Sequence, residues 1–177
     1  MQNTILTCPI PTNVNTLKPN GYQFALESIP SLSYFCQEVQ LPSVDLGTTE
    51  TATPFAAFPM PGDRLAFGDL TVQFLIDADM ANYKALFDWI QGLGFPEMNS
   101  QYSNQVRKDI PIGEVPATVS DATLSILGNN NRPIRYIRFI DCFPVSLSSV
   151  TFTSTSQDVQ YLVGNVTFKY SYFKFDA

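Results

Sequence analysis

Apolar and polar residues alternate along most of the chain, a pattern typical of β-strands buried on one face. The segment 69–77 (DLTVQFLID) is the clearest example, with one side formed by Leu70, Val72, Phe74 and Ile76. The same period predicts further strands at 22–28, 34–42, 122–128, 134–147, 150–154 and 160–175. We therefore expect a mainly β fold, a β-sandwich or split β-barrel, with a turn at Pro30 and Ser31 between its first two strands.

One segment has the period of a helix instead. Apolar residues recur at Met80, Tyr83, Leu86, Phe87 and Ile90, which is the 3.6-residue spacing of an amphipathic helix. We expect a single flanking helix over about residues 80–92, packed on the sheet through Tyr83, Leu86, Phe87 and Ile90. Gly92 or Gly94 is expected to end it in a left-handed conformation, and Pro96 prevents its continuation.

Two carboxylates, Asp77 and Asp79, stand one residue apart where the strand meets this helix. Asp79 is expected to be the N-cap, since a carboxylate there accepts hydrogen bonds from the free N–H groups of the first turn. Asp77 would then be a polar strand end. The alternative, a glycosidase pair, needs two carboxylates about 5 to 9.5 Å apart across a substrate, and no pattern singles out such a pair. We therefore predict a protein that is not an enzyme, with no catalytic residues.

The polar segments next to these elements suggest two extensions of a single domain, which we expect to span residues 1–177. Residues 1–20 contain Pro9, Pro11 and Pro19 among Asn and Thr, and read as an irregular arm. Residues 43–62 are rich in Thr and Ala, interrupted by prolines, and fit an extended flap or hairpin. No signal peptide is expected, because the N-terminus has no basic region followed by a long apolar one. No membrane-spanning stretch is expected, because no segment has the required run of about 18 apolar residues.

Composition points to extensive contacts between subunits. Apolar residues make up 45% of the chain and charged residues 15%, against about 25% charged in ordinary soluble domains. A surface this poor in charge is most simply covered by neighbouring subunits. The net charge of −6 argues against a protein that binds nucleic acid tightly through its phosphates.

The absence of histidine from the sequence excludes His-dependent triads, His proton shuttles and His-containing zinc sites. The three cysteines, Cys8, Cys36 and Cys142, lack CxxC spacing and are odd in number, which favours reduced, mostly buried thiols. No P-loop or GxGxxG motif occurs. We therefore expect no cofactor and no metal site.

Basic residues cluster once, at Arg132, Arg135 and Arg138. A polyanion-binding strip is one interpretation of this cluster. However, side chains three positions apart on a strand alternate between faces, so that Arg132 and Arg138 can share a face that Arg135 cannot. Ion pairs with acids of neighbouring subunits are the favoured interpretation.

From about Leu41 to Phe175 the chain resembles the tail tube proteins of contractile-tailed bacteriophages, together with the tube-initiating baseplate proteins that share their fold. The resemblance rests on LP at 41–42, on the turn, strand and Trp-containing helix of 59–94, and on 139–173. In the last piece a Phe-Pro corner precedes a short strand, and a long final strand ends in an aromatic run. Some tube initiators carry a long apolar N-terminal insertion that this chain lacks, so the repeated tube subunit is favoured over an initiator.

The resemblance implies six copies closing into a ring, with rings stacked into a tube whose lumen conducts double-stranded DNA without binding it specifically. It also implies partners in the same tail, namely sheath, baseplate, tape-measure and terminator proteins, no membrane, and a place in the virion after assembly in the host cytoplasm. The alternatives are an initiator, baseplate or terminator ring of the same fold, or a non-enzymatic β-sandwich binding module. The flap is expected to contact a neighbouring subunit along the tube axis through Thr49, Thr51, Thr53, Phe55 and Phe58.

A lumen that lets DNA slide should be lined by short polar side chains without surplus cations, since each Lys or Arg contact to phosphate adds affinity. The residues predicted to face it are Asn165, Thr167, Lys169 and Ser171 on the last strand, and Ser146, Ser148 and Thr151 or Thr153 before it. Lys169 fits this surface only if a neighbouring acid offsets its charge. The apolar face of the last strand would be Leu162, Val166, Phe168, Tyr170 and Tyr172.

Overall fold

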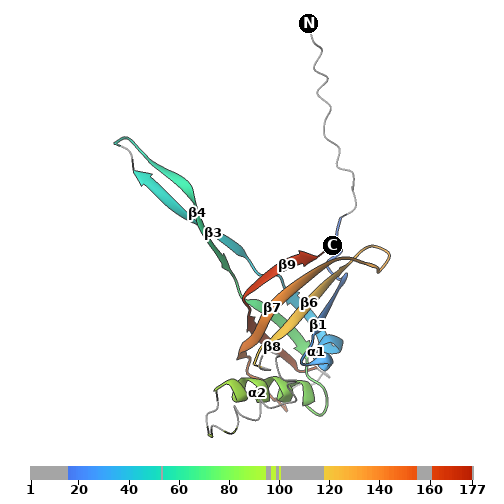
Figure 1. The fold of residues 1–177 in the computed structure, drawn as a ribbon. Coiled ribbons are helices and arrows are strands. Elements are labelled where there is room, and N and C mark those ends of the chain that lie inside the picture. The colour runs from blue at the N-terminus through green and yellow to red at the C-terminus, as the bar shows by residue number, and fades with distance from the viewer. Residues whose placement is uncertain are drawn as a thin grey trace, which may run out of the picture.

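The computed structural model describes residues 16–52, 54–94, 97–98, 100, 118–154 and 161–176, and these form a mainly β, antiparallel structure with two helices (Figure 1). The elements in chain order are β1 (Tyr22–Leu26), α1 (Pro30–Phe35), β2 (Cys36–Gln40), β3 (Val44–Ala52), β4 (Ala57–Phe67), β5 (Leu70–Leu75), α2 (Ala81–Gly94), β6 (Ser120–Leu127), β7 (Pro133–Leu147), β8 (Val163–Lys169) and β9 (Tyr172–Asp176). The expected fold class is confirmed. Neither of these helices is long and apolar enough to cross a membrane.

Two antiparallel layers share the long strand β7. Its first part pairs with β6 and β9, and β1 lies beyond β6; we call this layer the β6 sheet. Its last part pairs with β8, followed by β5 and β2; we call this layer the β8 sheet. β7 passes between the layers next to a bulge, where Asp141 has a φ of 56° and its N–H donates to Asp121 Oδ1 at 3.2 Å. One strand thus ties the two layers together.

The core lies between the two layers and follows the alternation in the sequence. Leu70, Val72 and Phe74 of β5 are fully buried, as predicted, and they face residues from the other strands. The other large, fully buried side chains are Phe24, Leu32, Leu86, Ile137, Phe139, Val166 and Phe168. Gly164 lies against the Phe74 ring, where an added Cβ would be 2.8 Å from Cζ, so this position has no room for a side chain.

Three details of the strand predictions are wrong. Residues 30–35 form the short helix α1 and not a turn and strand, because Pro30 fits the first turn of a helix and Leu32 is buried under it. Residues 150–154 form no strand. The final segment is two strands, since β8 ends at Lys169 and the chain turns at Tyr170 before β9 returns along β7.

The predicted helix is present as α2, below the strands in Figure 1, but it is rotated relative to the expected packing. Its buried residues are Asn82, Leu86, Trp89 and Gly92, whereas Phe87 is 51% exposed. Trp89 determines this orientation: its ring lies 6.4 Å from that of Phe168, and its Nε1–H donates to the Thr118 carbonyl at 3.3 Å. The helix also continues to Gly94, so Gly92 is a buried helical residue and not the cap.

We predict that Leu86→Ala destabilises the fold by about 2 to 5 kcal/mol, because Leu86 is fully buried and its removal leaves a cavity. Phe87→Ala, one position along the same helix, should change the free energy of unfolding by about 0.5 kcal/mol or less. Urea unfolding of the two variants, at a concentration where the protein is monomeric, measures both values. Equal losses would contradict the helix orientation described here.

Candidate assembly surfaces

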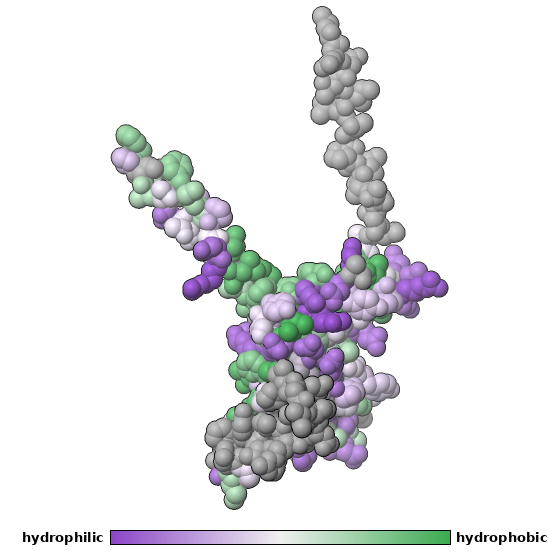
Figure 2. All heavy atoms as spheres, viewed as in Figure 1, coloured by the Kyte–Doolittle hydropathy of each residue, from purple (hydrophilic) through white to green (hydrophobic). Residues whose placement is uncertain are grey.

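The β3–β4 hairpin projects from the body of the molecule, at the end opposite α2 (Figure 1). The flap predicted for residues 43–62 is therefore a hairpin, although its second strand continues to Phe67. Every residue of β3 is exposed, and so is most of β4. The hairpin nevertheless carries large apolar side chains on its surface: Val44, Leu46, Phe55, Phe58, Met60 and Leu65. Figure 2 shows this apolar colour at both the base and the tip, and exposed apolar surface of this kind marks an interaction site.

The outer half of the hairpin has two different faces. Thr49 pairs with Met60 and Thr51 with Phe58, so these four side chains share one face. The opposite face carries the pairs Thr48 with Pro61, Glu50 with Pro59 and Ala52 with Ala57. Three of the predicted contact residues, Thr49, Thr51 and Phe58, are thus brought together. Phe55, at the tip, is 99% exposed, and Thr53 lies outside the described residues.

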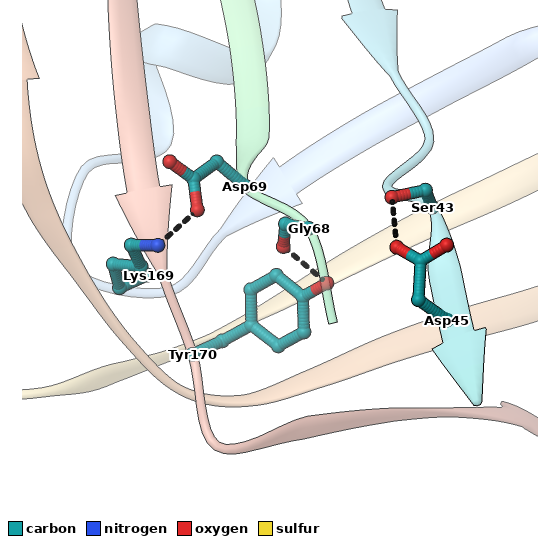
Figure 3. Close-up of polar contacts among 6 residues, drawn as sticks. All are labelled: Ser43, Asp45, Gly68, Asp69, Lys169 and Tyr170. Atoms are coloured by element: carbon teal, nitrogen blue, oxygen red, sulfur yellow. Dashed lines mark hydrogen bonds and ion pairs between the residues drawn. The ribbon is translucent and has the colours of Figure 1, made fainter. Parts of the chain in front are cut away.

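Polar contacts hold the base of the hairpin to the body (Figure 3). The Gly68 N–H donates to the Ser43 carbonyl at 2.9 Å and closes the base. The Tyr170 hydroxyl donates to the Gly68 carbonyl at 2.9 Å, as Figure 3 shows. Burial raises the pKa of Tyr170 to about 12, with smaller contributions from Cys142 and Asp69, so its hydroxyl remains a donor at neutral pH. These contacts fix the direction in which the hairpin leaves the sheets.

An aromatic cluster lies below this base. The Phe67 ring, at the end of β4, is 5.4 Å from that of Phe173 and 6.2 Å from that of Tyr170. Phe139 packs on both of these partners, with ring centroids 5.2 and 5.5 Å away. The hairpin is therefore anchored by packing as well as by hydrogen bonds.

The outer face of the β8 sheet carries most of the residues predicted to line the lumen. Thr167 pairs with Thr71 on one side and with Ser146 on the other, and Asn165 pairs with Gln73. Lys169 continues this face, and its Nζ forms an ion pair with Asp69 Oδ1 (Figure 3). The acid that Lys169 requires is thus present. Sequence reasoning missed Asp69 because its proximity to Lys169 follows from the pairing of β5 with β8, which no local pattern reveals.

The remaining residues predicted for the lumen are only partly joined to this face. The Ser148 Oγ accepts a hydrogen bond from the Asn165 N–H at 2.9 Å. Ser148 therefore lies beside β8, with its side chain bonded to the backbone of that strand. Ser171 lies after the turn that ends β8, and its Oγ donates to Asp141 Oδ2 at 3.1 Å. Thr151 and Thr153 are exposed but lie outside any strand. The candidate surface is therefore built mainly by β5, β8 and the end of β7.

The outer face of the β6 sheet has a different character. Arg138 pairs with Lys174 across β7 and β9, and both cations lie near Asp176, at 3.6 Å from Arg138 Nε and 3.9 Å from Lys174 Nζ. Tyr136 and Tyr172 are exposed on the same two strands. One of the three clustered arginines thus has an acidic partner within its own subunit, and this face is more basic and aromatic than that of the β8 sheet.

The carboxylate that caps α2 belongs to Asp77 and not to Asp79, which corrects the predicted N-cap. Asp77 Oδ1 accepts hydrogen bonds from the Asp79 N–H at 2.9 Å and from the Ala81 N–H at 3.1 Å. The chain doubles back here because Met80 has a φ of 53°, which turns the first helical N–H toward Asp77. Asn82 completes this junction, since its Nδ2 donates to the Leu75 carbonyl at 2.7 Å. Asp77 and Asn82 therefore both stabilise the junction between β5 and α2.

The two cysteines in the described residues are free thiols. Burial raises the pKa of Cys36 to about 11 and that of Cys142 to about 12, so both are protonated at neutral pH. Cys8 lies outside the described residues. In the part of the chain that the structure describes, no three Cys, Asp or Glu side chains gather in a way that could hold a metal ion.

Comparison with known proteins shows what these surfaces belong to. A family model described as "Phage tail tube protein" matches residues 4–176. The chain belongs to the phage tail tube protein family. It is 28% identical over 145 residues to the tail tube terminator protein of Enterobacteria phage T4, and this alignment covers 78% of this chain and 74% of that protein.

Two solved structures share the fold of this family member. The tube-terminating cap of the anti-feeding prophage superposes with a TM-score of 0.64 at 14% identity, covering 97% of this chain and 98% of that one. A chain of the sheath–tube complex of PVC, an extracellular contractile injection system, superposes with a TM-score of 0.58 at 21% identity, covering 97% and 94%. The predicted family is therefore confirmed, and the fold extends over nearly the whole chain.

Proposed function

We propose that this tail tube family protein is a structural subunit of the ring that terminates a phage tail tube. The observation that carries this proposal is the similarity to the T4 tail tube terminator over 78% of the chain. The fold shared with the anti-feeding prophage cap, over nearly the full length of both chains, supports the same position at the end of a tube. The role is non-catalytic, and the protein is part of the virion tail.

The second candidate is the repeated subunit of the tube itself, which the sequence favours. It is supported by the description of the family model and by the fold shared with a chain of the PVC sheath–tube complex. In both roles six copies would form a ring, and the partners would be further tube proteins, sheath and other tail components. The two roles differ in whether rings of this protein stack on one another.

The surfaces of the subunit suit a ring with a conducting lumen. The exposed apolar residues of the β3–β4 hairpin would be covered by a neighbouring subunit. The outer face of the β8 sheet would line the lumen, because Asn165, Thr167 and Ser146 are short and polar and Lys169 is paired with Asp69. Double-stranded DNA would slide past such a surface without being held.

Negative-stain electron microscopy of the purified protein at high concentration tests this proposal. Single six-fold rings support the terminator role, and long hollow tubes support the repeated subunit instead. A protein that stays monomeric by light scattering at every concentration would contradict both roles. Addition of preformed tubes from the same phage then distinguishes a terminator further, since its rings should appear at one end only.

A further inference from the structure

The two edges of the β3–β4 hairpin differ in their capacity to bind another strand. β4 contains Pro59 and Pro61, two residues apart, which pair with Glu50 and Thr48. Residue pairs in an antiparallel ladder alternate between those that exchange hydrogen bonds and those that do not. Since proline has no N–H to donate, Pro59 and Pro61 belong to pairs that do not exchange hydrogen bonds. The backbone of these residues therefore points away from β3.

This alternation leaves one edge blocked and one edge open. At the outer edge of β4 the two positions that would donate hydrogen bonds are prolines, so another strand cannot form a regular ladder there. At the outer edge of β3 the partners of these prolines, Thr48 and Glu50, direct their own N–H and C=O groups outward. All of β3 is exposed, and among the described strands it pairs with β4 alone. The hairpin can thus be extended through β3 only.

We propose that the outer edge of β3 adds to the free edge of β9 in a second copy of this chain, an inference that rests on the ring-forming role proposed above. Three described strands, β1, β2 and β9, end the layers and have free edges. Charge favours β9, because β3 carries Asp45 and Glu50, whereas Lys174 of β9 and the adjacent Arg138 of β7 outnumber the one acid beside them, Asp176. β2 carries Glu38 and would repel β3, and β1 has no charge.

Apolar contacts favour the same pairing. Tyr172 and Phe175 of β9 are 47% and 61% exposed in the free subunit, and β3 exposes Val44 and Leu46. Strand addition would place such side chains next to one another across the new ladder. The hairpin would extend the neighbour's β6 sheet by two strands, with the prolines of β4 closing the new edge. This contact joins two different surfaces, so it is head-to-tail and propagates in one direction around a ring.

Replacing Glu50 with proline tests the backbone contact directly. In Glu50→Pro the N–H that points outward is lost, whereas the pairing of β3 with β4 needs no donor at this position. We expect a folded protein with the wild-type unfolding midpoint that forms no assemblies at concentrations where the wild type is fully assembled. Glu50→Gln keeps the N–H and should assemble, although less tightly. Pro59→Val, which alters only the β4 edge, should assemble like the wild type.

Hydrogen exchange and a charge swap complete the test. The outward-pointing amides of Thr48, Glu50 and Ala52 should exchange rapidly in the monomer and be protected in the assembly. Glu50→Lys and Lys174→Glu should each weaken assembly, and the double variant should restore it. A folded Glu50→Pro protein that assembles normally, or amides of Thr48, Glu50 and Ala52 that stay unprotected in wild-type assemblies, would overturn the strand addition while leaving the ring intact. A failed charge rescue with protected amides would exclude β9 as the partner, and a wild type that never assembles would refute the proposed function itself.

Discussion

Deletion of residues 49–58 is expected to leave a folded protein that no longer assembles. This segment is the outer half of the β3–β4 hairpin, and none of its described residues is buried. The contacts that hold the hairpin to the body, from Gly68 to Ser43 and from Tyr170 to Gly68, all lie outside the deletion. The free energy of unfolding should therefore change little, while the apolar surface proposed to contact a neighbour is lost.

Two measurements on the deletion variant separate folding from assembly. Circular dichroism during thermal unfolding reports on the fold, and sedimentation together with electron microscopy reports on rings or tubes. The double variant Phe55→Ser/Phe58→Ser should weaken assembly without shortening the hairpin. Tyr34→Ser is the matched control, because Tyr34 is an aromatic residue 85% exposed on α1, away from the hairpin. Assemblies of normal size from the deletion variant would show that the hairpin has no role in contacts between subunits.

The parts of the fold that the sequence predicts correctly depend on local periodicity. Alternation places Leu70, Val72 and Phe74 in the core because a strand buried on one face allows few other arrangements. The exposed hairpin is also predictable, since its prolines, threonines and alanines fit neither a core strand nor a free loop. In both cases the deciding interactions involve neighbours along the chain.

The errors arise where distant contacts override the local pattern. The packing of α2 follows Trp89, which contacts Phe168 and the Thr118 carbonyl. The apolar stripe from which the packing was predicted does not include Trp89. Asp77 caps the helix because Met80 adopts a positive φ, which the sequence does not signal. In the candidate lumen, the pair of Asp69 with Lys169 depends on strand order and register. These facts follow only from the assembled sheets.

Introducing lysine at Asn165 and Thr167 should convert the proposed lumen from a surface that releases DNA into one that holds it. Both residues are on the outer face of β8, so the fold should tolerate longer polar side chains there. Each copy in the ring would add two cations to a surface where Lys169 is already neutralised by Asp69. Because each phosphate contact steepens the dependence of affinity on salt by about 0.9 in the log–log slope, binding should be strong at low salt and fall steeply as salt increases.

DNA binding by purified assemblies and the rate of genome ejection from virions carrying the variant measure this effect. The matched control is Thr123→Lys/Ser125→Lys, which adds the same charge to β6 of the other sheet, where Thr123 pairs with Arg138 and Ser125 with Tyr136. The variant in β8 should assemble, retain DNA and slow ejection, whereas the control should eject at the normal rate. If Asn165→Lys/Thr167→Lys prevents assembly and the control does not, the outer face of the β8 sheet is a contact between subunits, because unpaired cations buried there would separate them.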